Sequence, residues 1–105
     1  CRETERLLKE VAELSELVDL TVFNLQIDKA EAAAYRVDRV PATVVAGEKD
    51  YGIRYYGIPA GYEFASLLDA MRDVARGSAD LAPGSRAALT GLADPMHLQV
   101  FVTPT

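Results

Sequence analysis

The residues of this sequence that could do redox chemistry begin with its single cysteine, Cys1. One thiol cannot form an internal disulfide, and together with the single histidine, His97, it offers too few ligands for a zinc site. Cys1 opens directly into a segment with helical periodicity, and the free N–H groups of a helix N-terminus favour a thiolate. Cys1 is therefore a candidate redox residue. The alternatives are a small buried side chain or an incidental chain end.

The position of Cys1 at residue 1 admits two interpretations. A mature bacterial lipoprotein also begins with cysteine, but a flexible polar tether normally follows the lipid. Here the helical segment RETERLLKEVAEL follows instead, and the sequence has no initiator methionine. We therefore expect the chain to be a fragment of a longer protein.

A second candidate site is the pair Val40 and Pro41 in the segment RVDRVPATVV, residues 36–45. Proline cannot donate to a sheet ladder, so in strands it stands at the first residue, at an edge or at a bulge. Judged alone, Pro41 is an ordinary trans proline at the start of a strand. The alternative is a cis bond, which costs an X–Pro pair only about 0.5–1 kcal/mol and is kept where the backbone turns sharply.

The remaining polar and aromatic residues give weaker signals. His97 stands alone at the start of an expected strand, so we expect a packed or solvated side chain and not a catalytic base. Glu63 and Asp69 lie on a helix face and are interpreted as solvated. Three tyrosines fall on an expected hairpin, where strand aromatics usually pack: Tyr51, Tyr55 and Tyr56.

Composition and charge argue against several classes of partner. A chain of 105 residues predicts one small domain. Its net charge of −5 argues against a nucleic-acid surface and against binding to an anionic membrane. No apolar run approaches the roughly 18 residues of a spanning helix, and no signal-peptide pattern is present. We therefore expect neither nucleic acid nor membrane as a partner.

Hydrophobic periodicity predicts a mixed α/β chain. Leu7, Leu8 and Val11 recur at helical spacing, Asp28 is a plausible N-cap, and Gly77 is a natural C-cap. Helices are expected over residues 2–16, 29–36 and 61–76 and within 83–95. Strands are expected over residues 20–27, 42–46, 51–57 and 97–102. The turn GEKD joins the two middle strands in a β-hairpin.

Placing one further strand before the first helix gives the order βαβαββα, which is the thioredoxin-like arrangement. Three segments add to this pattern: YRVDRVPATVV, YGIRYYGIPAGYEFASLLDAM and VFVTPT. Together they resemble the protein disulfide oxidoreductases of archaea and thermophilic bacteria. These are glutaredoxin-like proteins built from two thioredoxin-fold units, each with its own C-x-x-C. The resemblance spans nearly the whole chain.

The resemblance implies an α/β, thioredoxin-like fold class and a division of the chain. Residues 1–77 would form a thioredoxin-like unit that lacks its first strand. Residues 78–105 would supply a linker, then the helix and first strand of a second unit. Cys1 would be the second, resolving cysteine of the first C-x-x-C, and the nucleophilic cysteine three positions upstream is absent from the sequence. The second C-x-x-C would begin directly after Thr105.

The resemblance also implies the chemistry. The activity is thiol–disulfide oxidoreduction of protein disulfides by dithiol–disulfide exchange, and this chain would hold an incomplete active site. The family needs no bound cofactor, since its cysteines carry the electrons. Its reducing partner would be a flavin-dependent disulfide reductase, its clients protein disulfides and dithiols, and its compartment the cytoplasm. A redox-inactive module of the same fold, binding extended peptides, is the alternative function.

Three structural expectations follow. In this family the proline before the strand is cis, so Val40–Pro41 should be cis, with its backbone open to substrate peptides. The sulfur of Cys1 should lie near that loop. The segment HLQVFV should fill the slot left by the absent first strand, pairing with residues 22–27 and 43–46 and bringing Thr105 close to Cys1. The rival arrangement keeps this strand apart or pairs it with another chain.

Overall fold

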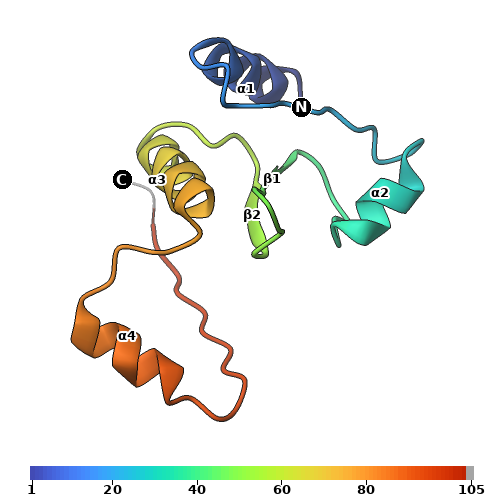
Figure 1. Ribbon diagram of the computed structural model, residues 1–105. Coiled ribbons are helices and arrows are strands. Elements are labelled where there is room, and N and C mark those ends of the chain that lie inside the picture. Colours follow the sequence, from blue (N-terminus) through green and yellow to red (C-terminus); the bar gives the residue numbers. More distant parts are fainter. Residues whose placement is uncertain (104–105) are drawn as a thin grey trace.

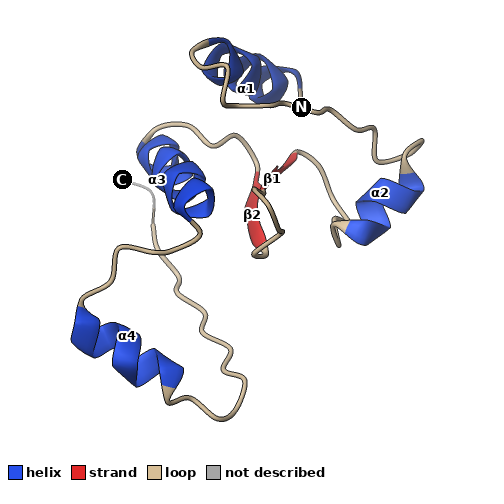
Figure 2. Cartoon of the chain, in the orientation of Figure 1, coloured by secondary structure: helices blue, strands red, loops and turns tan. Residues whose placement is uncertain are grey.

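The structure is a computed structural model that describes residues 1–103. Its helices and strands follow the expected mixed pattern (Figures 1 and 2). In chain order they are α1 (Arg2–Glu13), α2 (Lys29–Ala34), β1 (Ala42–Val45), β2 (Ile53–Tyr56), α3 (Tyr62–Arg76) and α4 (Pro83–Thr90). Within the described part of the chain, no helix combines the length and the apolar character needed to cross a bilayer.

The first helix is shorter than its apolar pattern predicts. It ends at Glu13 and not at residue 16, because Leu14 and Leu17 are 84% and 94% exposed and no packing extends the helix. Thr4 and Val11 are buried, and Leu8 packs against the core. The inward face of α1 is thus centred on residues 4, 8 and 11, which lie one turn apart.

The second helix begins where expected but is capped differently. Asp28 occupies the N-cap position, and its backbone C=O accepts a hydrogen bond from the Ala32 N–H at 3.0 Å. The N-cap prediction is therefore confirmed, but the Asp28 side chain does not cap the helix: one carboxylate oxygen accepts from the Asn24 N–H at 2.7 Å. The carboxylate therefore closes the preceding turn, over residues 24–28.

The expected hairpin is confirmed. Strands β1 and β2 pair antiparallel, with Ala42 opposite Tyr56 and Val45 opposite Ile53. The pairing extends one step further, since the Gly57 N–H donates to the Pro41 C=O at 2.9 Å. This pair forms the two-stranded sheet of the described residues.

Helix α3 covers the hairpin and completes a small core. It ends at Gly77, which has a left-handed φ of 71°, as its C-cap assignment predicts. Val45 of β1 packs with Leu67 and Val74 of α3. Four partly buried residues surround them: Leu8, Ile53, Tyr55 and Met71. Packing is close enough at Gly47 that a Cβ there would lie 2.8 Å from a methyl carbon of Val74, so the turn requires glycine.

Two of the expected strands are absent. Residues 20–24 form irregular backbone and 25–27 a turn, while 97–102 are irregular throughout. Val22 and Phe23 are 56% and 46% exposed, and Leu98 and Phe101 are 86% and 88% exposed. Their alternating apolar pattern is typical of strands, but a strand also needs a hydrogen-bonding partner, and neither segment pairs with one.

The expectation that residues 97–102 fill a slot between 22–27 and 43–46 is therefore wrong. Neither side of that pairing forms, because residues 22–27 are not a strand and β1 pairs with β2 alone among the described residues. Every residue from 75 to 103 is exposed, and α4 stands apart from the rest of the chain (Figure 1). The expected approach of Thr105 to Cys1 lies outside the described residues.

Much apolar surface consequently faces solvent. The chain exposes 8774 Å². A compact monomer of this mass exposes roughly 5,800 Å². The radius of gyration, 15.4 Å, likewise exceeds the roughly 13 Å of a compact chain of this length. Residues of β1, β2, α1 and α3 thus form one small packed core, and the segments outside it are largely exposed.

Candidate functional site

Cys1 lies at the start of α1 and is exposed. It is the N-cap residue, and its backbone C=O accepts the first helical hydrogen bond from the Glu5 N–H at 2.9 Å. The helix N-terminus favours negative charge at this position, whereas the carboxylates of Glu3 and Glu5 in the first turn oppose it. Glu5 is partly neutralised, because the Lys9 ammonium lies 2.6 Å from it. That contact lowers the pKa of Glu5.

Val40 and Pro41 lie at the start of β1, and the peptide bond between them is cis, as predicted. Pro41 is half-buried, and its C=O accepts a hydrogen bond from the Gly57 N–H, which extends the pairing of β1 with β2 by one step. Val40 is 53% exposed and precedes the ladder. The sequence thus places this pair correctly, at the point where the chain enters the sheet.

The ladder itself determines which backbone groups remain free. Hydrogen-bonded and non-hydrogen-bonded pairs alternate in an antiparallel sheet. Pro41 and Gly57 form a hydrogen-bonded pair. Thr43 and Val45 therefore direct their N–H and C=O toward β2, while Ala42 and Val44 direct theirs to the opposite side. This outward side, the free edge of β1, pairs with no strand of residues 1–103.

Cys1 and the Val40–Pro41 pair are two separate candidate positions. Across residues 1–103, no hydrogen bond joins Cys1 to either residue. The expected closeness of the sulfur to the Pro41 loop remains a prediction. Cys1 is the single thiol of the sequence.

Two threonines next to these residues were missed by the sequence reasoning. Thr4, one turn after Cys1, is 4% exposed, and Thr43, two residues after Pro41, is 8% exposed. Neither buried hydroxyl has a hydrogen-bond partner. An unpartnered buried hydroxyl costs stability, so each is an unsatisfied group beside a candidate site residue. The burial of Thr4 could have been predicted from the sequence, because Thr4 lies one turn before Leu8 and two turns before Val11, on the same helix face.

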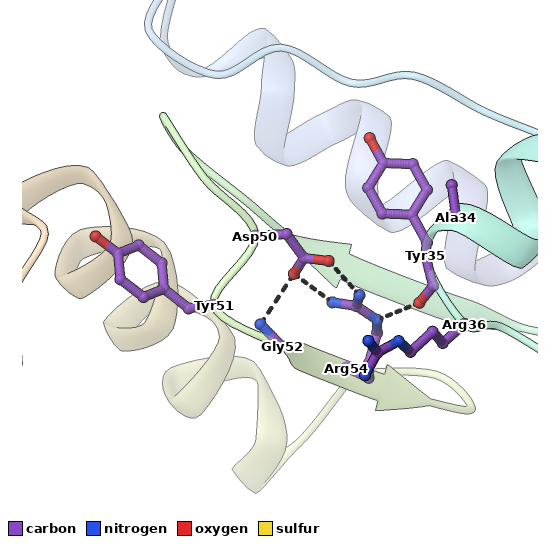
Figure 3. A pocket seen from close by; sticks show the side chains of 7 residues that line it. All are labelled: Ala34, Tyr35, Arg36, Asp50, Tyr51, Gly52 and Arg54. Atoms are coloured by element: carbon purple, nitrogen blue, oxygen red, sulfur yellow. Dashed lines mark hydrogen bonds and ion pairs between the residues drawn. The ribbon is translucent and has the colours of Figure 1, made fainter.

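A hollow of about 420 Å³ lies between the end of α2 and the hairpin (Figure 3). Its lining residues are Ala34, Tyr35, Arg36, Asp50, Tyr51, Gly52 and Arg54. Asp50 accepts from the Gly52 N–H at 2.9 Å and from both terminal nitrogens of Arg54. Arg54 Nε donates to the Tyr35 C=O at 3.0 Å, which ties the end of α2 to β2.

Of the three charged side chains that line this hollow, Asp50 and Arg54 are paired with each other, and the Arg36 guanidinium has no ion pair or hydrogen bond within residues 1–103. The hydrogen bond from Arg54 is the main cause that lowers the pKa of Asp50 to about 2. The same pairing raises the pKa of Arg54. Because Arg54 is held by Asp50 and by a backbone carbonyl, its donors fix the turn and do not face a ligand. We interpret the Asp50–Arg54 pair as a structural link between the hairpin turn and the end of α2.

The other residues named in the sequence analysis lie on other parts of the chain than Cys1, Val40 and Pro41. His97 is exposed on irregular backbone, and Glu63 and Asp69 are exposed on α3. The Tyr55 hydroxyl lies 2.9 Å from the Ser66 hydroxyl, which joins β2 to α3. No cluster of three or more potential metal-ligating side chains occurs within residues 1–103.

The sequence matches no protein-family model and no curated protein.

Proposed function

We propose that this chain is a segment of a thiol–disulfide oxidoreductase with a thioredoxin-like fold. The observation that carries the proposal is the position of Cys1, an exposed thiol in the N-cap position of the first helix. Supporting it is the unit of β-hairpin and covering helix that follows Val40 and Pro41. In this proposal residues 1–77 form the catalytic unit without its first strand, and residues 78–105 lead into a second unit.

The proposed role of Cys1 is to resolve a mixed disulfide. A nucleophilic cysteine three positions upstream, in the parent protein, first attacks one sulfur of a client disulfide. The client S–S bond breaks, that sulfur becomes covalently linked to the cysteine, and the other client sulfur leaves as a thiolate that takes up a proton. The Cys1 thiolate then attacks the sulfur of that upstream cysteine. A new disulfide forms within the motif, and the client sulfur leaves as a thiolate that takes up a proton. The client is thereby reduced by two electrons, and the motif is oxidised.

The proposal specifies partners as well. Clients are proteins with disulfides or dithiols, and the oxidised motif is reduced by a flavin-dependent disulfide reductase in the cytoplasm. No bound cofactor is required, because the two sulfurs carry both electrons.

The test extends the chain by a C-x-x prefix so that Cys1 has its partner thiol. Insulin-disulfide reduction is then followed by turbidity with dithiothreitol as the electron source. We expect the extended chain to accelerate reduction, and Cys1→Ser in the same chain to lose turnover. The control is a prefix with serine in place of the added cysteine, which should be inactive. Absence of acceleration, or turnover that survives Cys1→Ser, would contradict the proposal.

A second candidate function is peptide binding without redox chemistry. The observation that favours it is the exposed Val40 followed by the free edge of β1, where an extended peptide could add as a strand. Titration with a cysteine-free extended peptide should shift the amide resonances of Val40, Ala42 and Val44. Shifts confined to other parts of the chain would exclude this function.

A further inference from the structure

We propose that the hollow between the end of α2 and the hairpin binds a small monocarboxylate, held by the guanidinium of Arg36. Its lining residues come from the end of α2 and from residues 50–54, next to the hairpin turn. Val40 and Pro41 lie at the other end of the hairpin, and neither they nor Cys1 line the hollow. The inference therefore stands independently of the proposed redox function.

The turn at the end of α2 places Arg36 in an uncommon backbone conformation. The Arg36 N–H donates to the Ala33 C=O at 3.1 Å, and the Val37 N–H donates to the Ala32 C=O at 2.8 Å. These two bonds form a Schellman motif, whose left-handed residue is usually glycine. Arg36 occupies that position with a φ of 55°, a conformation that costs free energy in any residue with a Cβ. The turn alone therefore does not account for an arginine here.

The Arg36 guanidinium lines the hollow with unused donors. Its side chain extends from the end of α2 toward Arg54 (Figure 3). Asp50, the carboxylate of the lining, is already occupied by both terminal nitrogens of Arg54 and by the Gly52 N–H. Within residues 1–103, the Arg36 guanidinium has neither an ion pair nor a hydrogen bond. A guanidinium presents its donors as a planar fork that matches the two oxygens of a carboxylate.

The charges that line the hollow favour a ligand with one negative charge. Arg36 and Arg54 are cationic and Asp50 is anionic, so the lining has a net positive charge although the whole chain carries −5. Arg36 also contributes to the low pKa of Asp50, which indicates that the two groups lie close enough to interact. A monoanion neutralises the surplus positive charge, whereas a dianion would leave a net negative charge beside Asp50. The lining therefore favours a monocarboxylate over sulfate.

The hollow has room for more than a carboxylate group. Its volume is about 420 Å³, and pockets for small ligands measure roughly 300–1,000 Å³. Tyr35 and Tyr51 add aromatic surface to the lining, and Tyr51 is 46% exposed. A Cβ at Gly52 would meet no atom within 4 Å, so the backbone there borders open space. An aromatic acid fits this combination, and benzoate is the simplest probe.

The test is a titration of the chain with sodium benzoate at constant ionic strength, followed by NMR. We expect saturable shifts of the Arg36 Nε–H resonance and of the Arg36 and Gly52 amides. Because a single exposed guanidinium holds the carboxylate, we expect a dissociation constant on the order of 1 mM. Sodium sulfate at the same ionic strength should bind at least about tenfold more weakly.

Variants at Arg36 separate binding from folding. Arg36→Gly should weaken benzoate binding at least about tenfold, while its Tm stays equal or rises, because glycine adopts the left-handed conformation freely. Arg36→Lys keeps the positive charge at the end of α2 but lacks the planar fork, so its affinity should fall between those of the original chain and Arg36→Gly. Arg6→Gln is the control, because it removes an exposed arginine from α1 and should leave the affinity unchanged.

Several results would overturn the proposal. The absence of saturable shifts at Arg36 would do so, as would equal benzoate binding by the original chain and Arg36→Gly. Sulfate that binds as tightly as benzoate would contradict the assignment to a monocarboxylate. A marked fall in the Tm of Arg36→Gly would also overturn it, because the arginine would then serve the turn at the end of α2 and not a ligand.

Discussion

At the scale of single residues, the two candidate positions are an exposed thiol and an exposed valine. Cys1 lies at the start of α1, and Val40, which is 53% exposed, directly precedes Pro41 and β1. Thr4 and Thr43, close by in sequence, have buried hydroxyls without partners. Such hydroxyls are a cost to stability, and they can be removed without touching the thiol or the cis bond.

Replacement of Thr43 by valine should stabilise the chain. Valine keeps the shape of threonine, and the buried hydroxyl it removes has no partner, so we expect the free energy of unfolding to rise by about 1 kcal/mol. Thermal unfolding followed by circular dichroism should show a rise in Tm of about 4–8 °C.

Thr90→Val is the control for this change. The Thr90 hydroxyl donates to the Arg86 C=O at 2.8 Å on exposed α4, so its loss should give no gain in stability. A Thr43→Val chain that is equally or less stable than the original would show that the Thr43 hydroxyl has a partner in solution.

Residue-level features differ in how far the sequence predicts them. The cis bond at Pro41 was expected, because the surrounding motif is contiguous in sequence and resembles a known cis-proline segment. The Asp50–Arg54 pair was not predicted, although opposite charges four residues apart across a tight turn are a usable signal. The contact of Arg54 with the Tyr35 carbonyl could not be predicted, because it joins residues 19 positions apart whose relation depends on the path of the chain.

At the scale of elements, local pattern predicted those elements whose partners are close in sequence. The hairpin needs only the turn between β1 and β2, and α3 has both a helical apolar stripe and Gly77 as its cap. Residues 20–27 and 97–102 have equally good strand patterns, but a strand forms only when a partner edge is supplied. Alternation of apolar residues specifies which side chains would be buried and says nothing about whether a partner is present.

The link between α2 and the hairpin should be sensitive to pH. The pKa of Asp50 falls from its ordinary 3.8 to about 2 in the folded chain, mainly through the hydrogen bond from Arg54. In this range the unfolded chain binds more protons than the folded one, so stability rises with pH. The contribution of the pair is present above about pH 4 and is lost as the pH falls toward about 2.

We therefore expect Asp50→Asn to flatten the pH dependence of unfolding. The free energy of unfolding is measured by chemical denaturation at several pH values between about 2 and 4, and its slope against pH gives the number of protons taken up on unfolding. We expect this number to be smaller in the variant by up to about one proton. Asp80→Asn is the control, since Asp80 has no hydrogen bond or ion pair within residues 1–103. Equal pH dependence in the original chain and Asp50→Asn would contradict the assigned pairing.

At the scale of the whole molecule, the chain has a small core and an excess of exposed apolar surface. Three buried residues from β1 and α3 form the centre, and the exposed surface is larger than a compact chain of this mass requires.

The central claim is that Cys1 resolves a mixed disulfide, and trapping tests it most directly. The chain extended by a C-x-x prefix is mixed with a disulfide-containing client peptide, quenched with acid and analysed by intact mass. With Cys1→Ser, we predict that a covalent adduct of one client peptide accumulates on the added cysteine. With Cys1 present, the adduct should be transient and be replaced by oxidised chain and free client thiol. An adduct that persists equally in both chains, or forms in neither, would contradict the proposed function.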